Sequence, residues 1–350
     1  MKPLLVVHLG AGVHSRKRDY KAKIRRALEA GYKYAAEDSI KAVEMAIRAM
    51  EDDEALNAGF GSNLNRIGGV ECDAAIMCGQ SGAFGSITGL KGVRYPISVA
   101  RRIAEMEREK VGQLGLVRPM MLSGNECLEY LDESFERAKL STESQMKRWS
   151  EYSNMLEESG KKRQKEDNVE GDDQDEKKRR TLVEEEEDLH QDTVGAIAID
   201  SQGNISAGVS SGGIWLKLPG RIGEAAHFGS GIWAENATNE SPCIGISTSG
   251  TGEQIMRCLF ASKLSEILMK SENEVVDVQS FVKKEFLEHR WMAGYLERSL
   301  GFIVVKGQEV FIGHTTPSFA VGFQSGDRIE AFVSRKGRPG NDLLLECYKV

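Results

Sequence analysis

Thr193 lies at an abrupt change in the composition of this 350-residue chain. Between residues 161 and 190, 20 of 30 residues are charged, whereas TVGAIAID (193–200) is apolar and rich in β-branched residues. A threonine hydroxyl alone is a weak nucleophile, because its pKa lies far above neutral. If the bond between Asp192 and Thr193 is cut, Thr193 gains an α-amine with a pKa of about 8, which can accept the hydroxyl proton. The junction therefore allows two interpretations: a self-cleaving chain in which nucleophile and base belong to one residue, or a threonine that merely begins a strand.

A buried hairpin is predicted to begin at Thr193. TVGAIAID (193–200) and ISAGVSS (205–211) are short strands of small and apolar residues, joined by a QGN turn. Further strands are predicted over 3–9, 73–78, 81–90, 243–248, 301–314, 318–323 and 328–334, and helices over 17–50, 95–109, 252–270 and 275–291. The strands after residue 300 are expected to form a second antiparallel sheet. This pattern predicts an α/β (α+β) fold of stacked sheet and helix layers.

Other catalytic and cofactor-binding patterns are missing from the sequence. Gly10-Ala11-Gly12 follows a strand, but Ser15 stands where GxGxxG needs its third glycine, and no GxxxxGK[ST] is present. The six histidines include no HExxH pair, and the six cysteines include no CxxC pair. We therefore expect no metal ion and no cofactor in the site.

Charge and hydropathy argue against two classes of partner. The net charge of −7 argues against direct nucleic-acid binding, which usually requires a basic face. No apolar run approaches the roughly 18 residues of a membrane span. At the N-terminus the apolar run is too short for the core of a signal peptide. We therefore expect the nucleus, the cytoplasm or both as the location.

Residues 141–192 form the charged segment that precedes Thr193. The stretch 161–190 holds 8 Lys/Arg and 12 Asp/Glu. It has too little apolar surface to offset the entropy cost of ordering, so we expect disorder. Its two basic clusters, Lys161–Arg163 and Lys177–Arg180, allow two interpretations. They belong either to a solvated linker or to a two-part nuclear import signal that binds an import receptor.

Several stretches together resemble the N-terminal-threonine hydrolases, a family that includes plant-type asparaginases, glycosylasparaginases and taspases. The matching stretches are VHLGAG (7–12), NAGFGSNLN (57–65), VECDAAIM (70–77), DTVGAIAID (192–200), SSGG (210–213), LPGRIGE (218–224) and STSGTGE (247–253). They cover nearly the whole chain apart from the charged segment. The resemblance implies a four-layer αββα sandwich with two stacked, mainly antiparallel sheets. It also implies one composite domain, built from residues 1–140 and 193–350 on either side of the 141–192 segment.

The resemblance further implies roles for individual residues. Thr193 resembles the nucleophile and base, and Ser211 resembles a second hydroxyl that orients the α-amine. Arg221 resembles the residue that binds a substrate carboxylate, a task suited to a bidentate guanidinium. Ser249 and the Gly250 N–H resemble the oxyanion hole, which stabilises the tetrahedral intermediate.

Three more positions bear on substrate binding. Asn57 and Gly10 are implied to shape the site from the N-terminal part of the chain. Glu224 stands where asparaginases carry an aspartate that holds the substrate α-ammonium, and where taspases tend to be non-acidic. A glutamate can recreate ammonium binding, and with it asparaginase or isoaspartyl dipeptidase activity. It can also point away from the substrate, because it is one methylene longer.

The taspase (threonine aspartase) branch is the closer likeness. VHLGAGVHS with KRDYK (7–21), HTTPS (314–318) and the charged segment resemble it, and Asp192 stands where asparaginases usually have glycine. This likeness implies an endopeptidase that cleaves proteins after Asp, typically in a glutamine-apolar-Asp-Gly context. The cut chain would be an αβ heterodimer, alone or paired with a second one. Two alternatives stay open, an L-asparaginase or isoaspartyl dipeptidase, and an inactive scaffold whose charged segment binds partners.

Overall fold

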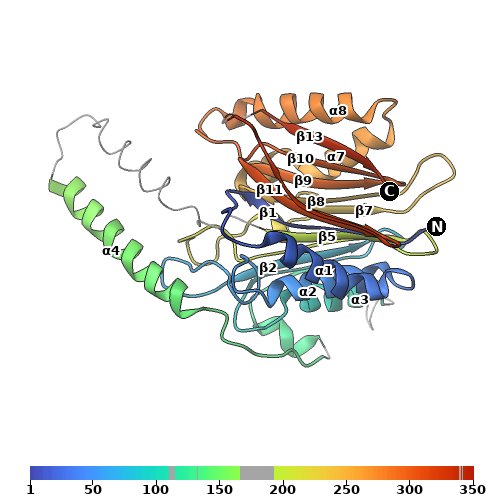
Figure 1. Ribbon diagram of the computed structural model, residues 1–350. Helices are drawn as coiled ribbons and strands as arrows, with labels where there is room; N and C mark the ends of the chain where they lie inside the picture. Colours follow the sequence, from blue (N-terminus) through green and yellow to red (C-terminus); the bar gives the residue numbers. More distant parts are fainter. Residues whose placement is uncertain (110–114, 132, 166–192, 339, 341) are drawn as a thin grey trace.

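The described residues form four stacked layers in the order helix, sheet, sheet, helix (Figure 1). The computed structural model describes residues 1–109, 115–131, 133–165, 193–338, 340 and 342–350. The outer helices of one layer are α1 (Tyr20–Ala35), α2 (Ser39–Glu51) and α3 (Pro96–Arg108), and those of the other are α6 (Gly252–Cys258), α7 (Phe260–Met269) and α8 (Glu274–Phe281). The expected α/β fold with two stacked, mainly antiparallel sheets is confirmed.

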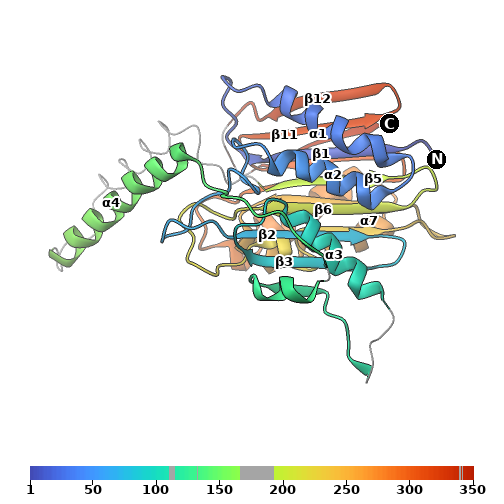
Figure 2. The same ribbon diagram turned by 90° about the horizontal axis from the view of Figure 1, so that it is seen from below.

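The larger sheet combines strands that precede and strands that follow the charged segment 141–192 (Figure 2). In spatial order its strands are β12 (Arg328–Arg335), β11 (Ser318–Ser325), β1 (Leu4–Gly12), β5 (Val194–Ile199), β6 (Ile205–Ser211), β2 (Cys72–Cys78), β3 (Phe84–Leu90) and β4 (Met121–Ser123). All neighbours are antiparallel except β3 and β4. Because β5 and β6 lie between β1 and β2, the segment after the charged stretch fills the middle of this sheet.

The smaller sheet holds fewer of the late strands than the sequence predicts. Its order is β13 (Leu344–Lys349), β10 (Glu309–His314), β9 (Leu300–Lys306), β8 (Ile244–Gly250) and β7 (Ile232–Glu235). The expectation that 318–323 and 328–334 join this sheet is wrong, because β11 and β12 extend the larger sheet beside β1. The buried strand β1 needs hydrogen-bonding partners on both sides, and β11 supplies the second one. An alternating pattern identifies a strand but does not select its partner.

Helix boundaries follow local signals with two exceptions. Asp19 and Asp38 cap α1 and α2, where each side chain accepts a hydrogen bond from the backbone N–H three residues later. The predicted helix over 252–270 is broken at Leu259, whose φ of 49° is left-handed, into α6 and α7. The helix predicted over 275–291 continues beyond α8 as a π-helical turn. The remaining helical segments are the 3₁₀ turns η2 (Glu126–Tyr130), η3 (Glu224–Ala226) and η5 (Arg290–Met292), and the π-helical turn η4 (Val282–Leu287).

Helix α4 (Glu143–Lys165) occupies the first part of the segment expected to be disordered, so that expectation is wrong there. Its N-terminal half is fixed by specific contacts rather than by an apolar face. Trp149 Nε1 donates to Asn65 O at 2.9 Å, and Tyr152 packs edge-on against Trp215. Its other end projects from the body of the molecule (Figure 1).

No helix in the described part of the chain is both long and apolar enough to cross a membrane.

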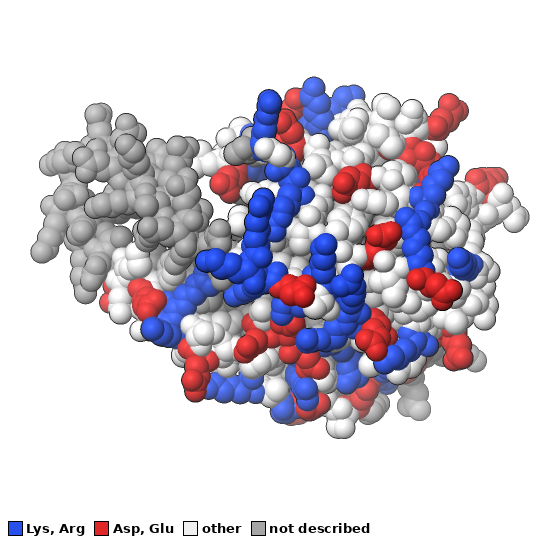
Figure 3. Space-filling model, viewed as in Figure 1, with Lys and Arg blue, Asp and Glu red and all other residues white. Residues whose placement is uncertain are grey.

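Only the first of the two basic clusters of the expected import signal lies within the described residues. Lys161–Arg163 lies within the last turns of α4. The second cluster, Lys177–Arg180, and the cleavage residue Asp192 lie outside the described residues. Elsewhere on the surface, Lys and Arg intermingle with Asp and Glu on the face seen in Figure 3, so this face is not uniformly basic.

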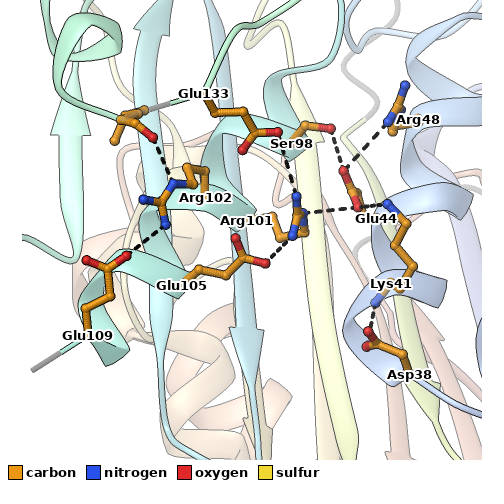
Figure 4. A network of polar contacts seen from close by, with 11 residues as sticks. Asp38, Lys41, Glu44, Arg48, Ser98, Arg101, Arg102, Glu105, Glu109 and Glu133 are labelled. Atoms are coloured by element: carbon orange, nitrogen blue, oxygen red, sulfur yellow. Dashed lines mark hydrogen bonds and ion pairs between the residues drawn. The ribbon is translucent and has the colours of Figure 1, made fainter.

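Two buried carboxyl groups on α2 have opposite environments. Burial alone would raise the pKa of Glu44, but hydrogen bonds from Lys41 and Ser98 and the charge of Arg101 lower it overall. Figure 4 shows these cations converging on Glu44. Glu51, about two turns later on the same side of α2, accepts a hydrogen bond from the Ile97 N–H at 3.0 Å, and burial raises its pKa to about 8. Glu44 is therefore held ionised and Glu51 neutral.

We expect Glu51→Gln to change the pH dependence of stability. The folded pKa of Glu51 lies above the unfolded value of about 4.3, so its contribution is present at low pH and is lost as pH rises toward 8. Glutamine keeps the acceptor for Ile97 but carries no charge. In urea unfolding of an uncleavable Thr193→Ala background, the variant should gain about 1 kcal/mol or more relative to its parent between pH 5 and pH 8.

The matched control is Glu44→Gln in the same background. The pKa of Glu44 is lowered, so its contribution is present above about pH 4.3 and is lost as pH falls. This variant should be less stable than its parent at pH 7, and the difference should shrink in acid. A stability difference for Glu51→Gln that stays constant from pH 5 to pH 8 would contradict the burial of a neutral carboxyl there.

Candidate active site

Thr193 immediately precedes β5 and is a buried residue with two polar partners. Its Oγ1 lies 3.2 Å from Ser211 Oγ and 2.8 Å from Glu224 Oε1. Only 2 % of Thr193 is exposed. The pairing of Val194 with Ser210 across β5 and β6 brings Ser211, the last residue of β6, beside Thr193. Two of the residues expected at the site therefore contact the expected nucleophile directly.

Glu224 is a buried carboxyl that points into the site. It begins the turn η3, where its backbone carbonyl accepts a hydrogen bond from the His227 N–H at 3.0 Å. Burial raises the pKa of its carboxyl, while the hydrogen bond from Thr193 and the charge of Arg221 act in the opposite direction. The alternative that Glu224 points away from the site is wrong, because the extra methylene brings the carboxylate to the Thr193 hydroxyl.

Arg221 is held in a fixed orientation by a residue that we did not expect. Its Nε and Nη2 donate to the two carboxylate oxygens of Glu253 at 2.8 and 2.6 Å. The other edge of the guanidinium faces glycine backbone. A Cβ at Gly213 or Gly223 would come within 3.3 or 2.9 Å of Nη1, and one at Gly252 within 2.9 Å of Nη2. Glycine backbone therefore packs close to Nη1 and Nη2, where a larger residue would meet the guanidinium.

Two further charged residues support this corner, one from β2 and one from the loop after β6. Asp73 pairs in register with Ser211, and its carboxylate accepts from the Gly89 N–H at 2.9 Å. Burial raises its pKa, against the opposing charge of Lys217. The Lys217 ammonium is buried and donates to the Glu71 carbonyl oxygen at 2.7 Å.

Sequence reasoning missed Glu253 and Asp73, although both lie in quoted stretches, STSGTGE and VECDAAIM. An acidic residue inside a strand predicted to be buried was the available signal for Asp73.

Two of the remaining expected residues, Asn57 and Ser249, connect neighbouring segments through hydrogen bonds. Asn57 Nδ2 donates to Gly213 O at 2.8 Å, and so does Asn63 Nδ2, which fixes the loop after β6. Ser249 Oγ accepts from the Ala11 N–H at 3.0 Å, so its hydroxyl ties β8 to the glycine turn at the end of β1.

Two glycines at this junction have conformations that other residues rarely adopt. The values of φ are 106° at Gly10 and 141° at Gly250. An oxyanion role for Ser249 and Gly250 stays a prediction, as does the part of Gly10 in shaping the site. Among the described residues, no group of three or more His, Cys, Asp or Glu could hold a metal ion.

Comparison with known proteins adds a family to this geometry. The family model described as "Asparaginase" matches residues 1–333. A protein named probable isoaspartyl peptidase/L-asparaginase from Drosophila melanogaster is 33 % identical over 345 residues, covering 96 % of this chain and 91 % of that protein. An isoaspartyl peptidase/L-asparaginase from Xenopus laevis is 30 % identical over 333 residues, 89 % of this chain and 95 % of the relative. A plant-type L-asparaginase from Thermococcus kodakarensis is 33 % identical over 271 residues, 75 % and 79 % respectively.

Proposed function

The chain belongs to the asparaginase family of hydrolases, and on this premise we propose that it is a self-processing enzyme whose nucleophile is the Thr193 hydroxyl. The observation that carries the proposal is the buried contact of Thr193 Oγ1 with Ser211 and Glu224 at 3.2 and 2.8 Å. A threonine that merely begins a strand would not require two polar partners, one of them a buried carboxyl.

The proposed reaction transfers an acyl group to Thr193. Cleavage between Asp192 and Thr193 gives Thr193 a free α-amine, which accepts the Oγ1 proton. Oγ1 then attacks the substrate carbonyl carbon, and the proton passes to the leaving nitrogen as the carbon–nitrogen bond breaks. Water hydrolyses the resulting ester and restores the threonine. The Ser249 hydroxyl and the Gly250 N–H are the proposed donors to the oxyanion.

Asparagine and β-aspartyl peptides are the substrates that we propose first. The relatives are named for this activity. Arg221 and Glu224 also offer opposite charges across one small space, since a Cβ at Gly252 would come within 2.9 Å of Arg221 Nη2 and 2.7 Å of Glu224 Oε2. A zwitterionic substrate can place its α-carboxylate on Arg221 and its α-ammonium on Glu224.

A second candidate is an endopeptidase of the threonine aspartase type, which cleaves proteins after Asp. Asp192 favours it, because self-cleavage at this bond would already be hydrolysis after Asp. In that reaction Arg221 would bind the side-chain carboxylate of the substrate Asp. Protein substrates, an αβ heterodimer after cleavage, and import into the nucleus through the two basic clusters are proposals that accompany this candidate.

Self-cleavage is the first expected result. Incubation of the purified chain near neutral pH should yield fragments 1–192 and 193–350 by intact mass, because Thr193 can attack the carbonyl that precedes it. Thr193→Ala has no hydroxyl and should stay whole. A parent chain that also stays whole between pH 5 and pH 9 would contradict the proposed function and favour the scaffold alternative.

Substrate class is decided by comparing three compounds on the cleaved enzyme. Free asparagine and a β-aspartyl dipeptide represent the first candidate, and a peptide with a Gln-apolar-Asp-Gly site represents the second. For whichever class is hydrolysed, Arg221→Lys should raise KM by about tenfold or more, because an ammonium cannot hold a carboxylate through two parallel hydrogen bonds.

The matched control for that variant is Arg257→Lys. Arg257 is exposed on α6, where its Nε contacts the Tyr295 hydroxyl at 3.4 Å, away from the Thr193 contacts. It should leave KM unchanged. Equal effects of the two variants would contradict a substrate carboxylate at Arg221.

A further inference from the structure

The proposed function leaves the first cleavage without a base. In the uncut chain the Thr193 nitrogen belongs to a peptide bond, and an amide nitrogen does not accept a proton near neutral pH. The α-amine that serves later turnovers is a product of this first cleavage. Some other group must therefore accept the Oγ1 proton once, before the chain is cut.

The contacts of Thr193 Oγ1 identify a candidate for this task. Its two hydrogen-bond partners among the described residues are the Ser211 hydroxyl and the Glu224 carboxyl. A serine hydroxyl is no more basic than the threonine it would deprotonate. A carboxylate oxygen at 2.8 Å lies within the distance required of a general base.

We propose that Glu224 is the base of self-cleavage, accepting the Thr193 hydroxyl proton in the uncut chain. This inference rests on the proposed function and adds a role for Glu224 that precedes any contact with substrate. Once the α-amine of Thr193 exists, that amine replaces Glu224 as the base. The carboxylate then becomes available to a substrate ammonium.

The step balances with water as its sole co-reactant. The Oγ1 proton moves to Glu224 while Oγ1 bonds to the carbonyl carbon of Asp192. The bond between that carbon and the Thr193 nitrogen then breaks, and the nitrogen takes the proton from Glu224. Water hydrolyses the ester, which leaves a carboxylate on Asp192 and a free hydroxyl on Thr193. No group is oxidised or reduced.

Side-chain length and backbone anchoring place the carboxylate where this step needs it. An aspartate at position 224 would be shorter by one carbon–carbon bond, about 1.5 Å, and would not span the 2.8 Å contact to Thr193 from the same backbone. The backbone of this turn is fixed, since the Glu224 carbonyl oxygen accepts from the His227 N–H at 3.0 Å. A Cβ at Gly231 would come within 2.5 Å of the same oxygen, so the two segments are tightly packed.

Neighbouring charges suit a carboxyl group that must both accept and return a proton. The charge of Arg221, in the loop before η3, favours the ionised form of Glu224. Arg221 is itself hydrogen-bonded to the carboxylate of Glu253 on α6. Asp73 on β2 and burial favour the protonated form. Burial is the largest of these influences and raises the pKa overall, so this carboxyl holds an accepted proton more readily than an exposed glutamate would.

The test follows self-cleavage of the full chain from its synthesis in a cell-free translation, by intact mass, between pH 5 and pH 9. Glu224→Gln keeps the size and the hydrogen-bonding capacity of the side chain but cannot accept a proton. We expect its cleavage to be slower than that of the parent by about 100-fold or more. The parental rate should rise with pH as Glu224 ionises, and this rise should be absent from the variant.

Two further variants separate a base from a merely structural group. Glu266→Gln changes an exposed carboxylate on α7, outside the contacts of Thr193, and should cleave within a few-fold of the parent. Glu224→Ala leaves space for a small acid, so added formate should restore cleavage in proportion to its concentration, whereas chloride should not. Rescue by formate would not be expected if Glu224 only supported the fold.

The outcomes distinguish this inference from the function on which it rests. A parent chain that never cleaves contradicts the proposed function itself. Parental cleavage matched within threefold by Glu224→Gln, or a folded Glu224→Ala that formate does not rescue, overturns the role of Glu224 and leaves the nucleophile in place.

Discussion

The contact between Thr193 Oγ1 and Glu224 Oε1, 2.8 Å long and buried, is the interaction on which the rest of the site depends. It joins the residue that precedes a central strand, β5, to the short turn η3. The hydroxyl is fixed because β5 is paired on both sides, by β1 and β6. The carboxyl is fixed because its turn is closed by the bond from His227. A contact between two rigid supports keeps its geometry without a cost in side-chain ordering at the moment of reaction.

Burial of this carboxyl is tolerated because charge is compensated nearby. Asp73 and Glu224 are both buried, and burial raises the pKa of each. Arg221 and Lys217 supply two positive charges in the same corner, and Glu253 fixes the direction in which Arg221 points. A charge left unpaired here would shift its protonation state or destabilise the fold. The same pairs that make burial possible therefore also set the orientation of the groups proposed to meet substrate.

The sheet arrangement would allow the chain to be cut beside Thr193, the proposed nucleophile, without losing its fold. Residues before and after the charged segment alternate within one sheet, as β1, β5, β6 and β2. Cutting ahead of Thr193 breaks one covalent link at the end of a central strand, while the hydrogen bonds of β5 to β1 and β6 stay in place. Apolar packing also continues on both faces of this sheet, against the helices on one side and the smaller sheet on the other. Thr193 thus keeps its position from neighbouring strands rather than from the chain that precedes it.

The sequence by itself determined most of the strands and helices and located the junction at Thr193. The change from charged to β-branched residues located Thr193, and the small and apolar residues after it predicted the β5–β6 hairpin. Asp38 marked the start of α2. These signals can be read from the sequence because each depends only on neighbours along the chain. Tertiary structure alone decided which sheet receives β11 and β12, that α4 is anchored through Trp149, and that Glu224 reaches Thr193 while Glu253 holds Arg221. Each of these depends on which residues distant in sequence come within a few ångströms of one another. Side-chain periodicity records which face of an element is buried, but it does not record what lies opposite that face.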